Sequence, residues 1–350
     1  MVEPVRIGNY TVSPGHPCFI IAEGGVNHNG DVGLAERMIV AAAQAGVDAV
    51  KFQTFRAEKL VSTDAPKASY QLRSTDVDES QYEMIKKLEL DPEAHCQLIA
   101  CCRKQGILFL SSPFDEESAD FLDEIGVPAF KIPSGEITNL PYLKHISRKG
   151  KPMIVSTGMA TLSEVEAAVG VIREEDDPGV ILLQCVSNYP AQPADVNLRA
   201  MATMSQAFGV PVGYSDHVLG NEVAFAAVAL GACVIEKHFT LDRSMPGPDQ
   251  ETSVEPSELM ALVQGIRAVE LALGDGQKRP AMSERNSAEV ARKSLVVTED
   301  IPAGTVLTED LIAVKRPGTG LPPSMLAFVI GRRVCRDMKR DSLVTLEDLV

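Results

Sequence analysis

Two histidines of this 350-residue chain end apolar segments and have the chemistry of metal ligands. His217 follows the residues GYSD, and His238 follows IEK in the next apolar segment. Neutral imidazole is the commonest side-chain ligand of metals, so the pair would suit Mn²⁺, Fe²⁺, Co²⁺ or Zn²⁺ together with water or carboxylate. Two histidines that are hydrogen-bonded in a polar core are the alternative. Asp249, in the following PGPDQ loop, either orients a ligand, contacts substrate or is a simple turn residue.

Two lysines lie inside apolar segments, Lys51 in VKFQ and Lys131 in FKIP. An unpaired ammonium is costly to bury, so two that face one site imply an anion between them, either phosphate or carboxylate. Ion pairs with Glu23 or Glu136 are a structural alternative that does not exclude the anion. Neutral donors for the same anion would come from Ser112, Ser134, Ser156 and Ser215. The sequence has neither a GxGxxG motif nor a Walker loop, so a nucleotide-binding fold is not indicated.

Eight short apolar segments must position these side chains. They begin at Cys18, Ala49, Ile107, Ala129, Pro152, Val180, Val210 and Ala232. Near-continuous apolar runs of this length are typical of parallel strands that are buried on both faces. Eight such strands predict a βα barrel, whose active site lies at the carboxyl ends of the strands. The polar residues at those ends are Glu23, Lys51, Gln53, Ser112, Lys131, Ser134, Ser156, Tyr189, Ser215, Asp216, His217 and His238, a convergence that chemistry explains better than packing.

Helical patterns separate the strands. Asp31 is a predicted N-cap and Gly46 a predicted C-terminal stop of one helix, while Thr161 and Glu164 have capping-box spacing at the start of another. A third helix, within 255–273, follows the last strand and would close the barrel. The spacing of the strands also reveals a polar insertion at about 56–91. We expect it to form a loop with a helix beside the mouth, as a lid, a partner contact or a passive insertion.

The sequence pattern changes after residue 274. Residues 275–292 are polar and lack periodicity, which indicates a linker. Residues 293–350 contain short β runs that are broken by IPAG and RPGTGLPP, and they predict a compact, mostly β domain. The chain therefore divides into a barrel over 1–274, a linker and a small C-terminal domain.

The composition narrows the class of protein. A formal charge of −15 and a pI near 4.9 argue against a nucleic-acid partner, which would require a basic face. No apolar run approaches the roughly 18 residues of a membrane span, and we see no signal peptide at the N-terminus. Seven cysteines without metal-type CxxC spacing suggest reduced, buried thiols and a cytoplasmic protein.

Several long motifs resemble those of the sialic acid synthase family. In order along the chain they are IAEGGVNHNG, VKFQTF, FLSSPFD, FKIPSGEITNLPYL, IVSTGMATLSEV, GYSDH and EKHFTLD. The tail, SLVVTEDIPAGTVLTEDLIAVKRPGTG, resembles the antifreeze-like (SAF) domain of the same family. The resemblance covers nearly the whole chain and implies a (β/α)8 TIM barrel followed by a small SAF domain of the β-clip type.

The resemblance also implies a reaction. Members of the family condense phosphoenolpyruvate with an N-acetylated mannosamine-type sugar and water, giving a nine-carbon sialic-type 2-keto acid and phosphate. In this picture His217 and His238 hold a divalent metal, usually Mn²⁺, and Glu23 lies near the reacting centre. The positions that match phosphoenolpyruvate-binding residues are Lys51, Ser112, Lys131, Ser134, Ser156 and Ser215, and those on the sugar side are Gln53, Glu136, Tyr189 and Asp249.

One position departs from the family pattern. Some members have a phosphate-binding asparagine two residues after the cysteine that matches Cys185, whereas here Ser187 stands at that position and Asn188 follows it. Either residue could bind the phosphate.

The small domain has its own role in the resemblance. Family members form homodimers in which the C-terminal domain of one chain covers the barrel mouth of the other. Arg316, in VKRPGTG, matches an arginine that reaches the N-acyl group of the sugar in the partner chain. A solvent-exposed turn arginine is the structural alternative. A closed mouth would exclude water and strengthen the electrostatic interactions inside.

Four functions stay open at this point. The first is an N-acetylneuraminate synthase that uses N-acetylmannosamine, and the second is an N,N'-diacetyllegionaminate synthase that uses a diacetamido-trideoxy hexose. The third is a Schiff-base aldolase with Lys51 or Lys131 as nucleophile. The fourth is a non-catalytic carbohydrate-binding protein, which would be expected to have lost part of the set formed by the histidines, the lysines and Glu23.

Overall fold

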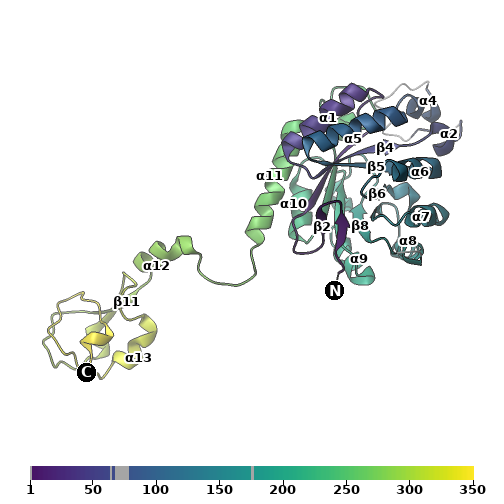
Figure 1. Ribbon diagram of the computed structural model, residues 1–350. Coiled ribbons are helices and arrows are strands. Elements are labelled where there is room, and N and C mark those ends of the chain that lie inside the picture. Colours follow the sequence, from purple (N-terminus) through teal and green to yellow (C-terminus); the bar gives the residue numbers. More distant parts are fainter. Residues whose placement is uncertain (1, 64, 68–78, 175–176) are drawn as a thin grey trace. The chain divides into compact units, whose positions relative to one another are not determined.

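Eight parallel strands form a closed barrel in the computed structural model, which describes residues 2–63, 65–67, 79–174 and 177–350 (Figure 1). The strands are β3 (Phe19–Gly25), β4 (Ala49–Thr54), β5 (Leu108–Pro113), β6 (Phe130–Ile132), β7 (Met153–Ser156), β8 (Val180–Cys185), β9 (Val212–Asp216) and β10 (Val234–His238). Their order in the sheet is β5-β4-β3-β10-β9-β8-β7-β6, and the two end strands β5 and β6 pack against each other. Every strand begins within two residues of its predicted start, so the predicted barrel is confirmed.

Alternation along each strand separates two cores. In β3, Phe19 and Ile21 point into the barrel and pack in one apolar cluster with Leu110, whereas Ile20 and Ala22 belong to a second cluster that includes the helices. Because side chains of a strand alternate between its faces, the interior sequence continues from Ile21 to the next inward position, Glu23. The lower barrel is therefore filled with apolar side chains, and polar side chains take over toward the carboxyl ends of the strands.

Helices surround the barrel. They are α1 (Val32–Ala45), α5 (Pro92–Gln105), α6 (Glu116–Glu124), α7 (Leu140–Ser147), α8 (Leu162–Glu174), α9 (Ala200–Phe208), α10 (Glu222–Ala229) and α11 (Pro256–Leu273). The Asp31 carboxylate accepts a hydrogen bond from the backbone N–H of Leu34 at 2.9 Å, and Gly46 ends α1 with a φ of 86°. Thr161 and Glu164 form the predicted capping box before α8. No helix among the described residues is long and apolar enough to cross a membrane.

An N-terminal hairpin that the sequence analysis did not predict packs against the barrel interior. It consists of β1 (Val5–Ile7) and β2 (Tyr10–Val12), which pair antiparallel. Val5, Ile7 and Val12 are buried in the same apolar cluster as the interior residues of the strands. The hairpin escapes prediction because each of its strands has only three residues.

The insertion at 56–91 lies in part outside the described residues. Its described portions include two short helices, α2 (Ala57–Leu60) and α4 (Gln81–Lys86). Although the insertion is polar overall, Met84, Ile85 and Leu88 are buried in an apolar cluster with Val26 and Phe55, which follow β3 and β4. The insertion therefore has a small core of its own.

The second compact unit spans Asp275–Val350 and includes the residues that we interpreted as a linker. Residues 285–291 form helix α12 (Arg285–Ala291), which the linker interpretation did not include. The Glu289 carbonyl accepts a hydrogen bond from the backbone N–H of Gly318 at 2.8 Å, which ties α12 to the small domain. The seven-residue helix lacks a buried face, and this is why periodicity did not reveal it.

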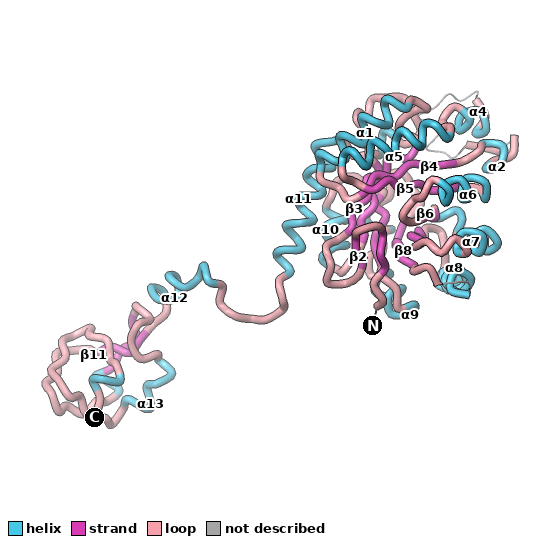
Figure 2. Tube along the Cα trace, in the orientation of Figure 1, coloured by secondary structure: helices cyan, strands magenta, loops and turns pink. Residues whose placement is uncertain are grey.

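The small domain has few regular elements. The only extended ladder within its described residues joins β11 (Ser294–Val297) to β12 (Ile312–Lys315), and isolated bridges such as Val334 to Leu349 connect the loops. Figure 2 shows loops making up most of this unit, together with the short helix α13 (Leu326–Val329). Its core includes Leu295, Leu307 and Val344.

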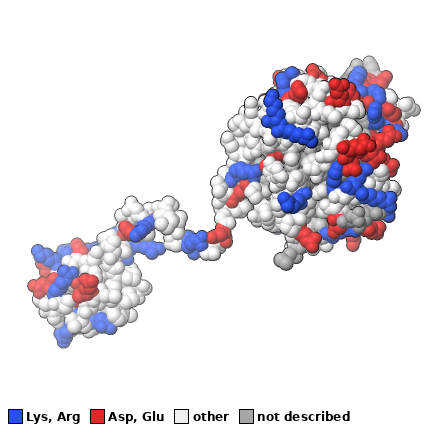
Figure 3. Space-filling model, in the orientation of Figure 1, with Lys and Arg blue, Asp and Glu red and all other residues white. Residues whose placement is uncertain are grey.

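All seven cysteines are free thiols. Cys18, Cys102, Cys185 and Cys233 are buried, as expected, but Cys96 and Cys335 are exposed, so the expectation that the thiols are buried holds only in part. On the face of the barrel unit drawn in Figure 3, acidic and basic side chains are intermingled.

The barrel interior has no room for a side chain at Gly213. A Cβ there would lie 2.4 Å from the carbonyl oxygen of Val234 and 2.8 Å from Cδ2 of Leu183. We expect Gly213→Ala to lower stability by about 1–3 kcal/mol or more, because overpacking forces strands apart. Gly170→Ala, on the exposed face of α8 with open space around the new methyl, should instead add about 0.5–1 kcal/mol. Thermal unfolding checks both variants, and equal melting temperatures would contradict the expectation.

Candidate active site

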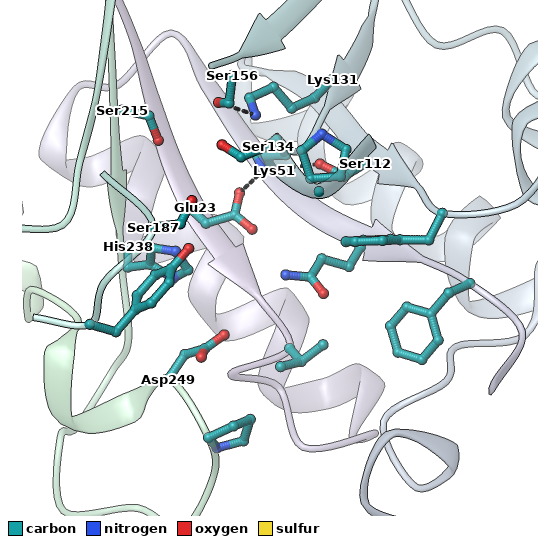
Figure 4. Close-up of a pocket in the computed structure, with 18 of the residues that line it drawn as sticks. Glu23, Lys51, Ser112, Lys131, Ser134, Ser156, Ser187, Ser215, His238 and Asp249 are labelled. Carbon is teal, nitrogen blue, oxygen red and sulfur yellow. Dashed lines mark hydrogen bonds and ion pairs between the residues drawn. The ribbon is translucent and has the colours of Figure 1, made fainter. Parts of the chain in front are cut away.

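A cavity of about 360 Å³ opens at the carboxyl ends of the barrel strands, a volume typical of small-molecule sites. Most of the predicted site residues line it: Glu23, Lys51, Gln53, Ser112, Lys131, Ser134, Ser156, Ser187, Tyr189, Ser215, His217, His238 and Asp249. Figure 4 shows Glu23 between the lysine–serine side of the cavity and the side that carries His238 and Asp249. Residues from many different strands therefore converge on one space.

Four of the residues that the sequence predicted near the site do not line this cavity. Glu136 accepts a hydrogen bond from Asn139. Asn188 is exposed, so of the two candidates for the family's asparagine position only Ser187 lines the cavity. Asp216 points to the outside of the barrel. Arg316 belongs to the second unit.

Four buried charges form the floor of the cavity. Lys51 is ion-paired with Glu23, and its ammonium lies 3.6 Å from a carboxylate oxygen of Glu236. Lys131 lies 3.6 Å from the other oxygen of Glu236. All four side chains are at most 6% exposed, so the two positive and two negative charges compensate one another out of contact with water. The structural alternative considered for Lys51 is therefore present, whereas Lys131 is paired with Glu236 and not with Glu136.

Sequence reasoning missed Glu236. It lies inside the apolar segment VIEKH of β10, two residues before His238, so both side chains point into the barrel. A charged residue at an inward position of a buried strand was the available signal. The same logic that selected Lys51 and Lys131 would have found it.

The serines connect to this charged floor. Lys51 donates to Ser112 Oγ at 3.1 Å and Lys131 donates to Ser156 Oγ at 2.7 Å. Ser215 donates to Glu236 at 3.1 Å. These hydrogen bonds fix the ends of the long lysine side chains, so the positive charges are held in place and do not sample many rotamers.

Gly158 packs tightly against two of the predicted serines. The backbone N–H of Gly158 donates to Ser134 Oγ at 3.0 Å. A Cβ on Gly158 would lie 2.8 Å from Ser134 Oγ and 2.3 Å from Ser187 Oγ. The absence of a side chain at Gly158 lets Ser134 and Ser187 lie close to the backbone, and both serines line the cavity with hydroxyls that can donate to anion oxygens.

Burial shifts the protonation of two acidic groups toward neutral pH. It raises the pKa of Glu23 to about 7, with the Glu236 carboxylate adding to this effect and the Lys51 ammonium opposing it. Burial also raises the pKa of Asp249 to about 6, against the opposing influence of His217 and Lys51. Carboxyl groups that titrate near neutrality can both donate and accept protons at physiological pH.

The two histidines lie side by side, with 5.3 Å between their ring centroids. His217 Nδ1 donates to the carbonyl oxygen of Val186 at 2.7 Å, which leaves Nε2 with its lone pair in the neutral ring. His238 Nδ1 is buried and has no hydrogen-bond partner in the part of the chain that the structure describes. Burial, with His217 and the nearby lysines, holds the pKa of His238 well below its usual value, so this ring is neutral.

These observations fit a metal ion with two protein ligands. When both rings are neutral, the pair offers the donors that a transition metal needs, and His238 has an unpartnered buried nitrogen. No group of three or more histidine, cysteine or acidic side chains suited to a metal occurs among the described residues. Any metal held here would therefore complete its coordination with water or substrate oxygen.

An ion pair outside the barrel holds the two histidine-bearing strands together. Lys237 donates to Asp216 at 2.6 Å and to the carbonyl of Val218 at 2.7 Å, and Asp216 accepts from Tyr214 and from the backbone of Val218. Asp216 directly precedes His217, and Lys237 directly precedes His238. The Lys237–Asp216 ion pair thus joins the ends of β9 and β10. The two histidines are the neighbouring, inward-pointing side chains.

Comparison with known proteins identifies the family. The NeuB family model matches residues 38–278, and the SAF domain model matches residues 292–350. The chain belongs to the NeuB family. Both matches agree with the resemblance seen in the motifs and with the order of the two domains.

Several relatives of this NeuB family protein are named as synthases of N,N'-diacetyllegionaminic acid or of N-acetylneuraminate 9-phosphate. The N,N'-diacetyllegionaminic acid synthase of Campylobacter jejuni is 50% identical over 93% of this chain and 98% of its own length. The human N-acetylneuraminate-9-phosphate synthase is 38% identical over 96% of this chain and 93% of its own length. The crystal structure of N-acetylneuraminic acid synthetase from Leptospira borgpetersenii has a TM-score of 0.73 and 38% identity, and covers 83% of this chain and 96% of that one.

From the raised pKa of Glu23 we predict how the stability of this NeuB family protein depends on pH. Between its ordinary pKa of 4.5 and about 7 the folded state binds more protons than the unfolded state, so stability falls as the pH rises through this window. Glu23→Gln removes the titration. We expect the metal-free wild type to lose about 2–3 kcal/mol relative to this variant between pH 5 and 8.

Urea unfolding, followed by circular dichroism at several pH values, measures the difference. Glu166→Gln on the exposed face of α8 is the control. Its stability should depend on pH in the same way as that of the wild type. Parallel curves for wild type and Glu23→Gln would contradict the assignment of this titration.

Proposed function

We propose that the protein is a nonulosonate synthase that condenses phosphoenolpyruvate with an N-acylated mannosamine-type sugar and water. The observation that carries the proposal is one cavity lined by two fixed lysines, two adjacent histidines and Glu23. Figure 4 shows Glu23 between the lysine side and His238. An anion site next to a metal site is what this condensation requires. Two relatives, named N,N'-diacetyllegionaminic acid synthase and N-acetylneuraminate-9-phosphate synthase, support the same reaction.

The lysine side of the cavity would bind phosphoenolpyruvate. Lys51 and Lys131 offer charged donors to its phosphate and carboxylate, with hydroxyls from Ser112, Ser134, Ser156, Ser187 and Ser215. Bound phosphoenolpyruvate is a trianion and would neutralise part of the lysine charge that Glu23 and Glu236 neutralise in its absence. We expect Glu23 to become protonated more readily when phosphoenolpyruvate binds, because its ion pair with Lys51 weakens.

The histidine side would hold a divalent cation, with Mn²⁺ as the first expectation, through His217 and His238. When bound, the cation acts as a Lewis acid toward the aldehyde of the open-chain sugar. Gln53, Tyr189 and Asp249 would orient the sugar, and Tyr189 already lies 4.2 Å from the ring of His217 between centroids. Glu23, with a pKa of about 7, is placed to exchange a proton with the water that adds to C2 after C3 has attacked the aldehyde.

A Schiff-base aldolase is a second candidate that one observation favours. Burial lowers the pKa of Lys131, which increases its neutral, nucleophilic form. That mechanism predicts irreversible labelling of the protein when borohydride is added with substrate, and indifference to chelators. Phosphate release that requires metal and leaves no borohydride-trapped adduct would exclude it.

The second unit would complete the site in a homodimer. Exposed apolar side chains, Met159, Leu162 and Leu219, are 74%, 47% and 59% exposed on loops and a helix end that follow the barrel strands. A cover over these residues would exclude water from the cavity. We propose that the partner's C-terminal domain is this cover, with Arg316 reaching the N-acyl group of the sugar. The free cysteines fit a cytoplasmic enzyme.

Replacing one histidine tests the metal site. His238→Ala should reduce phosphate release to background and weaken Mn²⁺ binding at least about 10- to 100-fold, the cost of losing even an outer partner of a metal ligand. Isothermal titration with Mn²⁺ and a phosphate-release assay give independent readouts, and circular dichroism checks the fold. His16→Ala, at an exposed histidine outside the cavity, should behave as wild type. Undiminished turnover in His238→Ala would refute the metal role.

Mixing two defective chains tests the homodimer. At sugar concentrations where Arg316→Ala is inactive, it is combined with His238→Ala and the subunits are exchanged. If Arg316 acts on the partner's site, each heterodimer has one intact site, and random exchange should restore about a quarter of wild-type activity. No recovery, with heterodimers verified by differential tags, would exclude action in trans.

A further inference from the structure

The outer part of the cavity is apolar. The segments of the chain that form it differ from those that form the floor. Leu60, Val61, Met84, Ile85 and Leu88 of the insertion line it, and Val26, Phe55 and Phe114 join them from the loops after β3, β4 and β5. We call these eight side chains the apolar wall. All eight are either buried in the insertion's own small core or partly buried against it, so the core supports the wall from behind.

The charges of the cavity are concentrated on its floor. Lys51 and Lys131 are the only lysine or arginine residues in the described lining, and both are fixed by Glu236 and by serines at the bottom. The apolar wall itself carries no charge. A phosphate on the acceptor sugar would therefore meet aliphatic groups and no cation in the described lining.

Two amide side chains accompany the apolar wall. Gln53, at the end of β4, and Gln81, at the start of α4, line the same cavity. A carboxamide has both a donor and an acceptor, which is the pair that an acetamido group needs. The described lining of this part of the cavity is therefore rich in methyl and methylene groups, contains amides and has no lysine or arginine.

From this combination we infer that the apolar wall makes the enzyme selective for a deoxygenated, doubly N-acetylated hexose over N-acetylmannosamine or its 6-phosphate. The inference rests on the proposed function and names the branch of substrates within it. A 2,4-diacetamido-trideoxy sugar presents a C6 methyl group and a second acetamido group where N-acetylmannosamine presents hydroxyls. The methyl groups can pack on the wall, whereas hydroxyls placed there would lose water without gaining hydrogen-bond partners.

The size of the preference follows from the chemistry of such sites. An apolar pocket discriminates against an added hydroxyl by about 10- to 100-fold in kcat/KM, because the hydroxyl can only partly be accommodated. A phosphate dianion costs far more to desolvate, so the 6-phosphate should be turned over at background rates. We expect no effect of the wall on the KM for phosphoenolpyruvate, which binds at the floor.

The first experiment compares the three sugars with the full-length, Mn²⁺-loaded enzyme. Phosphate release from phosphoenolpyruvate is followed at several concentrations of each sugar. A preference of at least about tenfold for the diacetamido-trideoxy sugar supports the inference. A preference for N-acetylmannosamine or for its 6-phosphate overturns the inference and leaves the proposed function intact. No release with any of the three overturns both.

The second experiment assigns the preference to the wall. Val61→Thr keeps the shape of the side chain and adds one hydroxyl at a half-buried position of the wall, so folding should be preserved. We expect it to reduce the preference about three- to tenfold, with an unchanged KM for phosphoenolpyruvate. Val290→Thr, the same change at an exposed residue of α12, is the control.

Leu60→Gln provides a second variant at another half-buried position of the wall and should act in the same direction. Thermal unfolding shows whether either variant has lost structure. If the ratio of kcat/KM values for the two sugars is the same in wild type, Val61→Thr and Leu60→Gln, the wall does not select the sugar.

Discussion

The mutual compensation of four buried charges is the constraint on which the site depends. Glu23, Lys51, Glu236 and Lys131 come from three strands that adjoin in the sheet and one across the barrel, and none of them would be stable at this depth without the others. Removal of one partner leaves an uncompensated charge, so these positions are coupled energetically. The same arrangement is chemically useful, because an entering anion can replace a carboxylate as the partner of each lysine.

The barrel makes this arrangement possible through the period of the strand. Inward residues are apolar in the lower part of each strand and polar at its carboxyl end, as in the step from Ile21 to Glu23. The apolar lower layers keep water away from the floor of the cavity from below. Raised carboxyl pKa values at Glu23 and Asp249 are a consequence of this burial, since each has burial as its largest cause. Packing and catalytic chemistry therefore have the same origin in this fold.

The sequence was sufficient for the barrel and for most of the residues around the cavity. Near-continuous apolar segments are a strong signal of buried strands, and a lysine or histidine inside one of them is easy to recognise. Glu236 was missed although the same signal was present, whereas the β1–β2 hairpin and α12 were missed because three to seven residues without a clear pattern carry little information. The apolar wall could not have been derived from the sequence. Its members are scattered through a polar insertion and three loops, and only the fold brings them to one side of the cavity.

The two sides of the cavity thus have separate origins in the chain. The charged floor and the histidine pair are parts of the strands, where a one-residue shift would turn every side chain to the opposite face. The apolar wall belongs to loops and to an insertion with its own small core, which can change without disturbing the barrel. Chemistry common to a family is expected on the rigid part and discrimination between similar sugars on the variable part. Under this proposal, relatives that are named for different acids would share the strand residues and differ in the wall.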